Sequence, residues 1–144
     1  MDKGIDVLLS ILYLLDRVWG RTYLQKLLFL LNTEVYKGRL FEFKEYKYGP
    51  FSIDINNAVT KLNEERLIDE RAVGTKGSEV AYTYTLTKKG RRVANDIFER
   101  RLSASERNKL IAYTNRFRRY SPTELLLYVY QEYPEYTKYS IFGK

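Results

Sequence analysis

Three polar side chains, Asn57, Thr60 and Lys61, recur at helical spacing in a segment whose other side is apolar. The apolar residues follow the i, i+3, i+4, i+7 spacing of one buried helix face: Ile55, Ala58, Val59 and Leu62. An asparagine can form two hydrogen bonds with adenine, and a lysine reaches guanine or phosphate. We therefore predict a recognition helix, opened by Ser52 or Asp54, whose exposed face reads bases in the major groove of DNA.

Acidic side chains limit what this helix can do with phosphates. Glu64 shares its outer face, Asp54 lies near its start, and Lys61 is its one cation. We expect the phosphate contacts to come from basic residues further along the chain. The residues predicted for this role are Arg71, Lys76, Lys88, Lys89, Arg91 and Arg92.

The formal net charge of +7 is concentrated in one part of the chain. Between residues 87 and 119, Lys and Arg far outnumber the three acidic residues Asp96, Glu99 and Glu106. A local excess of this kind is typical of a protein that binds a polyanion such as double-stranded DNA. The alternative is a solvated basic face without a partner.

The chain contains no His and no Cys. Disulfides, thiolate chemistry and a catalytic triad with His are therefore excluded, and the commonest zinc ligands are missing. We predict a protein without cofactor or metal that is not an enzyme.

One pattern of residues suggests a different chemistry. Glu42 and Lys44, and likewise Glu45 and Lys47, form Glu-x-Lys pairs on an expected strand, as in one class of metal-dependent nucleases. Such a site needs a further acid to complete a magnesium site, and Asp16 is the only candidate. Pairs of this kind also arise in any charged strand with alternating polarity.

The elements around the recognition helix follow a familiar order. Strand-like runs at residues 68–73 and 79–86 are joined by residues 74–78, and Leu86-Thr87-Lys-Lys-Gly90 opens another helix. Helix, hairpin and helix in this order are typical of a winged helix-turn-helix. We predict a mostly helical α+β fold of this type with additional N- and C-terminal helices, as one domain at residues 1–134 with a tail at 135–144.

The N-terminal part is expected to supply two helices and a strand. Residues 5–18 are apolar on nearly all sides, so this helix lies either in the core of the monomer or against a second subunit. Thr22 and Gln25 resemble a capping box for a second helix that ends near Tyr36. The alternation at residues 43–46 predicts a short, half-buried strand.

The C-terminal part is expected to be helical. After a helix at 88–101, which buries a stripe of apolar residues, Ser103 with Glu106 and Ser121 with Glu124 predict two further helix starts. The stripe consists of Val93, Ala94, Ile97 and Phe98. The tail is expected to dock through its aromatic residues Tyr136, Tyr139 and Phe142.

No run of residues is long and apolar enough to span a bilayer, and the start of the chain does not resemble a signal peptide. These features predict a cytoplasmic protein that does not enter the membrane. A homodimer through the N-terminal or C-terminal helices is a further possibility.

Two motifs in the chain occur together in a known family. Leu24-Gln25-Lys26, followed by Tyr48-Gly49-Pro50-Phe51-Ser52, resembles the Panacea domain of SocA-like antitoxins and, more closely, the YwgA-like proteins. The resemblance covers about residues 20–90. It implies an antitoxin or adaptor that acts by direct contact with a protein partner such as a toxin.

The same motifs have a structural interpretation. We expect Gln25 and Lys26 on the surface of their helix, beside a stripe of leucines, with Gly49 and Pro50 directing the chain into the next helix. This scaffold role is preferred over direct contact with a ligand. The preferred function is a winged-helix DNA-binding protein in transcriptional control, and the alternative is a Panacea-like module that holds its partner on residues 48–52 or the Tyr-rich C-terminus.

Overall fold

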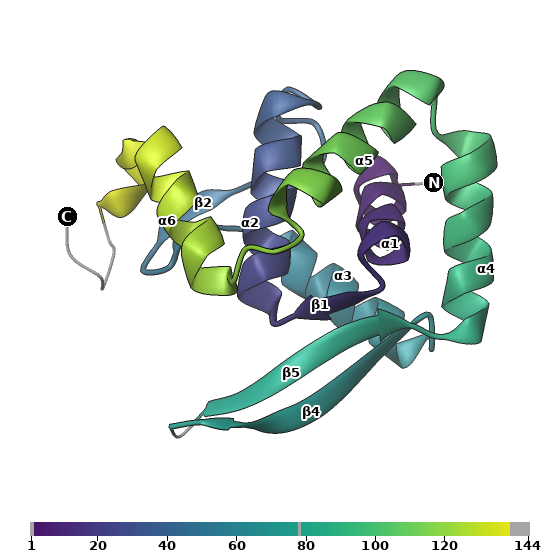
Figure 1. Ribbon diagram of the computed structural model, residues 1–144, viewed down its shortest axis with the longest axis horizontal. Coiled ribbons are helices and arrows are strands. Elements are labelled where there is room, and N and C mark those ends of the chain that lie inside the picture. The colour runs from purple at the N-terminus through teal and green to yellow at the C-terminus, as the bar shows by residue number, and fades with distance from the viewer. Residues whose placement is uncertain (1, 78, 139–144) are drawn as a thin grey trace.

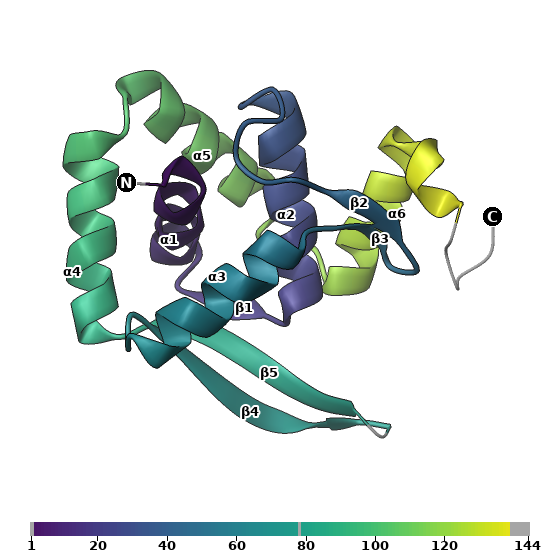
Figure 2. The same ribbon diagram turned by 180° about the vertical axis from the view of Figure 1, so that it is seen from behind.

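The structure, a computed structural model, describes residues 2–77 and 79–138. Helices dominate it, and its strands are short, as Figures 1 and 2 show. The predicted α+β class with mostly helical content is therefore confirmed. Within the described residues, no helix combines the length and the apolar character needed to cross a membrane.

Helix α1 (Lys3–Leu15) lies at the centre of one half of the molecule. It packs against α4 (Lys88–Asp96), α5 (Ala104–Phe117) and a strand, so that residues on all its sides are buried. Of the two places considered for this apolar helix, the structure therefore shows the core of the monomer.

The predicted end of this helix at Val18 is wrong. The helix stops at Asp16, whose φ of 66° ends the helical path. The next residues form strand β1 (Arg17–Trp19), in which Val18 is buried opposite Tyr84.

A sheet with the strand order β1-β5-β4 carries the predicted hairpin. Strand β4 (Ile68–Lys76) extends three residues beyond its predicted end and has a bulge between Ala72 and Gly74, while β5 (Glu79–Leu86) has the predicted bounds. The hairpin projects from the helical body, and β1 pairs only with its base (Figure 1).

Helix α2 (Arg21–Glu34) packs against β3 and α6. The capping box predicted for Thr22 and Gln25 is wrong, because Gly20 occupies the N-cap position and the helix has no side-chain cap. Gln25 is buried and bonds to another segment instead.

A second, two-stranded sheet connects α2 to the next helix. The strand predicted at residues 43–46 is β2 (Lys44–Tyr46), but it is exposed and not half-buried. It pairs with β3 (Gly49–Phe51), which the sequence did not predict because Gly-Pro usually interrupts a strand.

Helix α3 (Ile53–Glu64) follows directly and is capped by Ser52, as predicted. Its predicted apolar face is confirmed, since Ile55, Ala58, Val59 and Leu62 are all buried. Figure 2 shows α3 crossing the molecule above the β4–β5 hairpin.

The C-terminal helices agree closely with the predicted pattern. Thr87 caps α4, which continues into a π-helical turn, η1 (Ile97–Arg101), and the predicted stripe is buried except for the half-buried Val93. The capping boxes of Ser103 and Ser121 are confirmed at the starts of α5 and α6 (Pro122–Glu132).

The beginning of the predicted tail forms a 3-10 helix, η2 (Pro134–Thr137). The ring of Tyr136 lies 5.0 Å from that of Phe29 in α2, so this part of the chain docks as expected. The other two aromatic residues assigned to docking, Tyr139 and Phe142, lie outside the described residues.

Candidate functional site

The outer face of α3 is available to a partner. Asn57, Thr60 and Lys61 are exposed, as predicted for base-reading residues. Asp54 and Glu64 are exposed on the same helix, so the face is polar without being strongly positive. Asn56 is half-buried instead and accepts hydrogen bonds from α2: its side chain from Gln25 and its backbone carbonyl from Arg21.

The hairpin contributes fewer free cations than expected. Arg71 is exposed, but its guanidinium lies 3.0 Å from the carboxylate of Asp69, so it would have to leave this partner to bind a phosphate. Lys76 is the last residue of β4, and its side chain lies outside the described part of the structure.

Helix α4 presents the predicted basic residues to solvent. Lys88, Lys89, Arg91 and Arg92 are all exposed. Arg91 pairs with Asp16 at 3.1 Å, whereas the other three form no ion pair within the described part of the chain. The start of α4 adjoins the end of α3, because Gly90 lies against the backbone of Leu67 (Figure 2).

Several other cations of the basic segment have structural roles. Arg101 lies 3.3 Å from the buried carboxylate of Asp6, and Arg118 donates to the carbonyl of Leu14. Arg116 lies over the rings of Phe117 and Tyr128, at 4.9 and 5.2 Å from their centroids. The charge excess at residues 87–119 is thus only partly available to a polyanion.

The family motif of α2 is buried, and the prediction that Gln25 and Lys26 lie on the helix surface is wrong. Their exposed fractions are 2% and 1%, and Leu24 beside them belongs to the core. Gln25 Nε2 donates to the carbonyl of Ser52 at 2.8 Å, and Gln25 Oε1 accepts from the Ser52 N–H at 2.9 Å. One side chain therefore satisfies both backbone groups of the residue that caps α3.

Lys26 makes the second link between the two motifs. Its ammonium nitrogen donates to the carbonyl of Pro50 at 2.8 Å. Burial removes water from this amine and lowers the pKa of Lys26 from its ordinary value to about 7. At neutral pH the motif therefore holds a lysine that is only partly protonated.

The Tyr48–Ser52 segment also has little free surface. Gly49 has a φ of 84°, and a side chain there would meet Leu126 at 2.9 Å and Tyr130 at 3.3 Å. Gly49, Pro50 and Ser52 are buried and Tyr48 is half-buried, so the segment does not present one of the two partner surfaces predicted for the alternative function, the other being the Tyr-rich C-terminus. The two motifs together act as a clamp that positions the start of α3.

The contribution of this clamp can be measured with Gln25→Leu. The variant leaves the buried N–H and C=O of Ser52 without these partners, so we expect the free energy of unfolding to fall by about 2 kcal/mol. Urea denaturation followed by circular dichroism measures the change. Gln131→Leu, at an exposed position of α6, is the matched control and should have little effect. Equal stability of the two variants would contradict the clamp.

The Glu-x-Lys pairs lack the acid that a nuclease site requires. Asp16 forms its ion pair with Arg91 of α4 instead. Glu42, Lys44 and Glu45 line a pocket of about 310 Å³ with Asp54, an acid that the sequence analysis did not connect with these pairs. Within the described residues, no group of three acidic side chains is placed to hold a metal ion.

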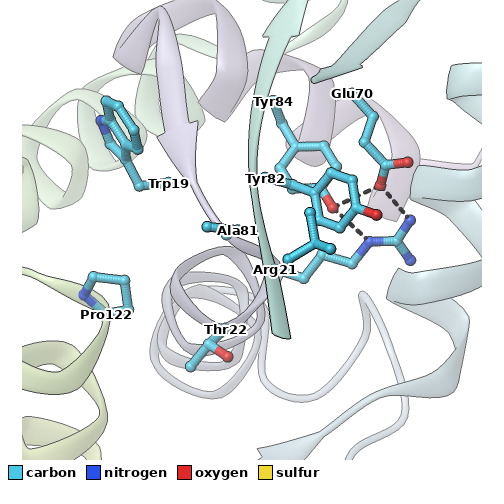
Figure 3. A pocket seen from close by; sticks show the side chains of 10 residues that line it. Trp19, Arg21, Thr22, Glu70, Ala81, Tyr82, Tyr84 and Pro122 are labelled. Atoms are coloured by element: carbon cyan, nitrogen blue, oxygen red, sulfur yellow. Dashed lines mark hydrogen bonds and ion pairs between the residues drawn. The ribbon is translucent and has the colours of Figure 1, made fainter. Parts of the chain in front are cut away.

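A larger pocket, of about 620 Å³, lies where β1 ends and α2 begins. Figure 3 shows Arg21, Glu70 and Tyr84 turned toward one another beside it. Arg21 Nη2 and the hydroxyl of Tyr84 both donate to Glu70 Oε2, at 2.9 and 2.7 Å, and Arg21 Nε donates to Tyr84 Oη at 2.9 Å. Partial burial opposes the charge of Glu70, but these hydrogen bonds outweigh it and hold the pKa of its carboxyl below the ordinary value.

None of the residues of this pocket was among those predicted for a site. No local signal pointed to them, because Arg17, Val18 and Trp19 are too few to show the alternation of a strand. Val18 is buried, whereas Trp19 is 54% exposed and lines the pocket.

Comparisons with known proteins do not assign this chain to a family. No protein-family model matches the chain, and the search of curated proteins found no match.

Proposed function

We propose that the protein is a winged-helix DNA-binding protein that acts in transcriptional control without enzymatic activity. One observation carries the proposal: the exposed polar face of α3 lies beside a projecting two-stranded hairpin. The order of elements, α1-β1-α2-β2-β3-α3-β4-β5, and the strand order β1-β5-β4 support the winged-helix assignment, with the β2–β3 pair inserted between α2 and α3.

In this proposal the residues divide into two roles. Asn57, Thr60 and Lys61 face the base edges of the major groove, where Asn57 can form two hydrogen bonds with an adenine. Cations of the hairpin and of α4 bind phosphates and supply most of the affinity. These cations are Arg71, Lys76, Lys88, Lys89, Arg91 and Arg92.

The assembly and location follow from the same role. A homodimer would place two copies of α3 on neighbouring half-sites of one DNA duplex. In the same proposal the protein acts in the cytoplasm.

The phosphate contacts can be tested with the combined change Lys88→Ala, Lys89→Ala, Arg91→Ala and Arg92→Ala. Each lost phosphate contact should lower the slope of log affinity against log salt by about 0.9, so we expect a flatter slope and affinity at least about tenfold weaker at low salt. Fluorescence anisotropy with a mixed-sequence duplex, titrated across salt concentrations, measures both quantities.

Lys37→Ala with Arg39→Ala, two exposed cations in the loop after α2, provides a control that should keep the wild-type slope. If the α4 variant binds like the wild type, α4 does not contact phosphates. If the wild type fails to bind at low salt, where charges are least screened, DNA binding itself is wrong.

A second candidate is a protein-interaction module of the Panacea-like antitoxin or adaptor kind. Large apolar side chains exposed on the sheet favour it, namely those of Trp19, Val73, Val80 and Tyr82. Exposed apolar clusters mark surfaces that bind other proteins. Co-purification of a toxin encoded beside this protein, in place of DNA binding, would support this candidate.

A further inference from the structure

The outer edge of β5 is open near the tip of the hairpin. Strand β4 pairs with β5 from Glu79 to Leu86, but β1 pairs only with Thr83, Tyr84 and Thr85. Gly20, with a φ of 87°, turns the chain away into α2, so β1 cannot continue along this edge. In the described part of the chain, Val80, Ala81 and Tyr82 therefore have a strand partner on the β4 side only. Such an edge presents unpaired backbone N–H and C=O groups.

The 620 Å³ pocket lies directly alongside this open edge. Val80, Ala81 and Tyr82 belong to its lining, together with Trp19, Thr22 and Pro122. Figure 3 shows Ala81 on the side of the strand that faces Trp19 and Tyr82 on the side that faces Arg21. We call this combination of strand edge and pocket the β5 groove. A strand that continued the line of β1 would place a side chain in the pocket while its backbone paired with β5.

The exposed side chains of the groove are apolar. Trp19, Val80 and Tyr82 are 54%, 47% and 38% exposed, and apolar surface of this kind gains free energy when a partner covers it. The two charged residues of the lining, Arg21 and Glu70, pair with each other. The groove therefore complements an uncharged segment and offers little attraction to a phosphate.

We propose that the β5 groove binds an extended, uncharged segment of a partner protein as an additional strand, with one apolar side chain in the pocket beside Trp19. Backbone hydrogen bonds to Val80, Ala81 and Tyr82 provide part of the affinity. The pocket determines which side chain of the bound segment is accepted. The opposite edge of the hairpin, β4, is the one that packs against α3. The peptide site is thus separate from the α3 face, and it does not depend on DNA binding.

Trp19 is the one tryptophan of the chain, so its fluorescence reports on binding around this side chain. Because Trp19 also lines a neighbouring pocket of about 510 Å³, the variants described below are needed to place the binding in the groove. The probe is a blocked five-residue peptide that alternates threonine and valine around a central leucine. We expect a saturable blue shift of the Trp19 emission with this peptide. Peptides with glutamate or lysine at the centre should bind at least about tenfold more weakly, because their charge would lose water in an apolar pocket.

Two N-methylated versions of the leucine peptide test the strand pairing. One carries methyl groups on the amides of its odd positions and the other on those of its even positions. Successive amides of a strand point to opposite sides, so only one of the two sets can face β5. One methylated peptide should lose binding and the other should keep it. Equal binding of both would contradict pairing as a strand.

The matched pair Val80→Lys and Val73→Lys tests the location. The two valines are 47% and 45% exposed, on β5 and β4 of the same hairpin, and both variants should melt like the wild type. Val80→Lys should weaken peptide binding at least about tenfold, since lysine on an edge strand discourages pairing, and Val73→Lys should not.

Three further outcomes would overturn the proposal. No saturable shift with any of the peptides would show that the groove does not bind extended segments. Equal effects of the two lysine variants would place the binding elsewhere. A dimer in sedimentation analysis that Val80→Lys dissociates would show that the occupant is a second copy of this chain and not a partner protein.

Discussion

Between pH 7.5 and 8.5, the free energy of unfolding is expected to rise by about 1 kcal/mol because of Lys26. The pKa of this amine is about 7 in the folded protein and 10.5 in the unfolded chain. In this window the unfolded chain therefore binds one proton more than the folded protein, so removal of protons favours folding. Below pH 7 both states hold the proton and above pH 10.5 neither does, so the effect of Lys26 levels off at both ends.

Urea denaturation at several pH values across this window measures the slope directly. The buried tyrosines oppose this slope at higher pH, because they titrate near pH 10 in the unfolded chain, whereas burial raises the pKa of both Tyr23 and Tyr84 to about 12 in the folded protein. The window therefore ends at pH 8.5, before these tyrosines begin to lose their protons in the unfolded chain. Lys26→Met replaces the amine by an apolar group of similar length, and we expect its stability to lose this dependence on pH.

Lys61→Met removes an exposed lysine from α3 and should keep the wild-type slope. A wild-type curve that is flat between pH 7.5 and 8.5 would contradict the partly protonated lysine. If Lys26→Met shows the same dependence of stability on pH as the wild type, the group that titrates in this window is not Lys26. Because Lys26 bonds to Pro50 at the entry to α3, its protonation changes the stability of the segment that positions the proposed recognition helix.

Gly90→Ala is expected to lower the free energy of unfolding by about 3 kcal/mol or more. A Cβ atom at Gly90 would overlap the carbonyl oxygen of Leu67 and lie 2.8 Å from its carbonyl carbon. These are backbone atoms at the base of the hairpin, where the Leu67 carbonyl also accepts the N–H of Thr87 at 3.1 Å. Neither segment can move aside without breaking this bond.

Helix propensity alone predicts that Gly90→Ala raises the free energy of unfolding. Alanine is more favourable than glycine inside an exposed helix by about 1 kcal/mol, so a stabilised variant would show that α4 does not pack closely on Leu67. Thermal and urea denaturation show whether Gly90→Ala is less stable or more stable than the wild type. Arg92→Ala, at an exposed position of the same helix, is the control and should change the stability little.

The sequence alone determined the elements that depend on residues close together in the chain. Ser103 and Ser121 cap the helices that they were expected to cap, because a cap needs only a side chain and an amide two or three residues away. Ser52, one of two candidates, caps α3, and Thr87 of the segment predicted to open a helix caps α4. The buried face of α3 also followed from periodicity, since one apolar stripe of a helix is visible in the order of its residues.

Only the tertiary structure decided the elements that depend on distant partners. Strand β1 has three residues, too few for a periodic pattern, and it exists because Val18 pairs with Tyr84 far along the chain. Gln25 and Lys26 have polar side chains that favour the surface in isolation. They are buried because the backbone of Pro50 and Ser52 supplies their hydrogen bonds, and such pairing leaves no local signal.

The candidate binding surfaces also differ in whether the sequence alone could predict them. The polar face of α3 and the exposed cations of α4 follow from helical spacing, so the sequence identified them. The β5 groove arises where β1 ends, β5 continues and Pro122 of α6 approaches, and no single stretch of the chain contains these parts. Local interactions encode helices and their caps, whereas a groove between strands and helices depends on long-range packing that the order of residues does not display.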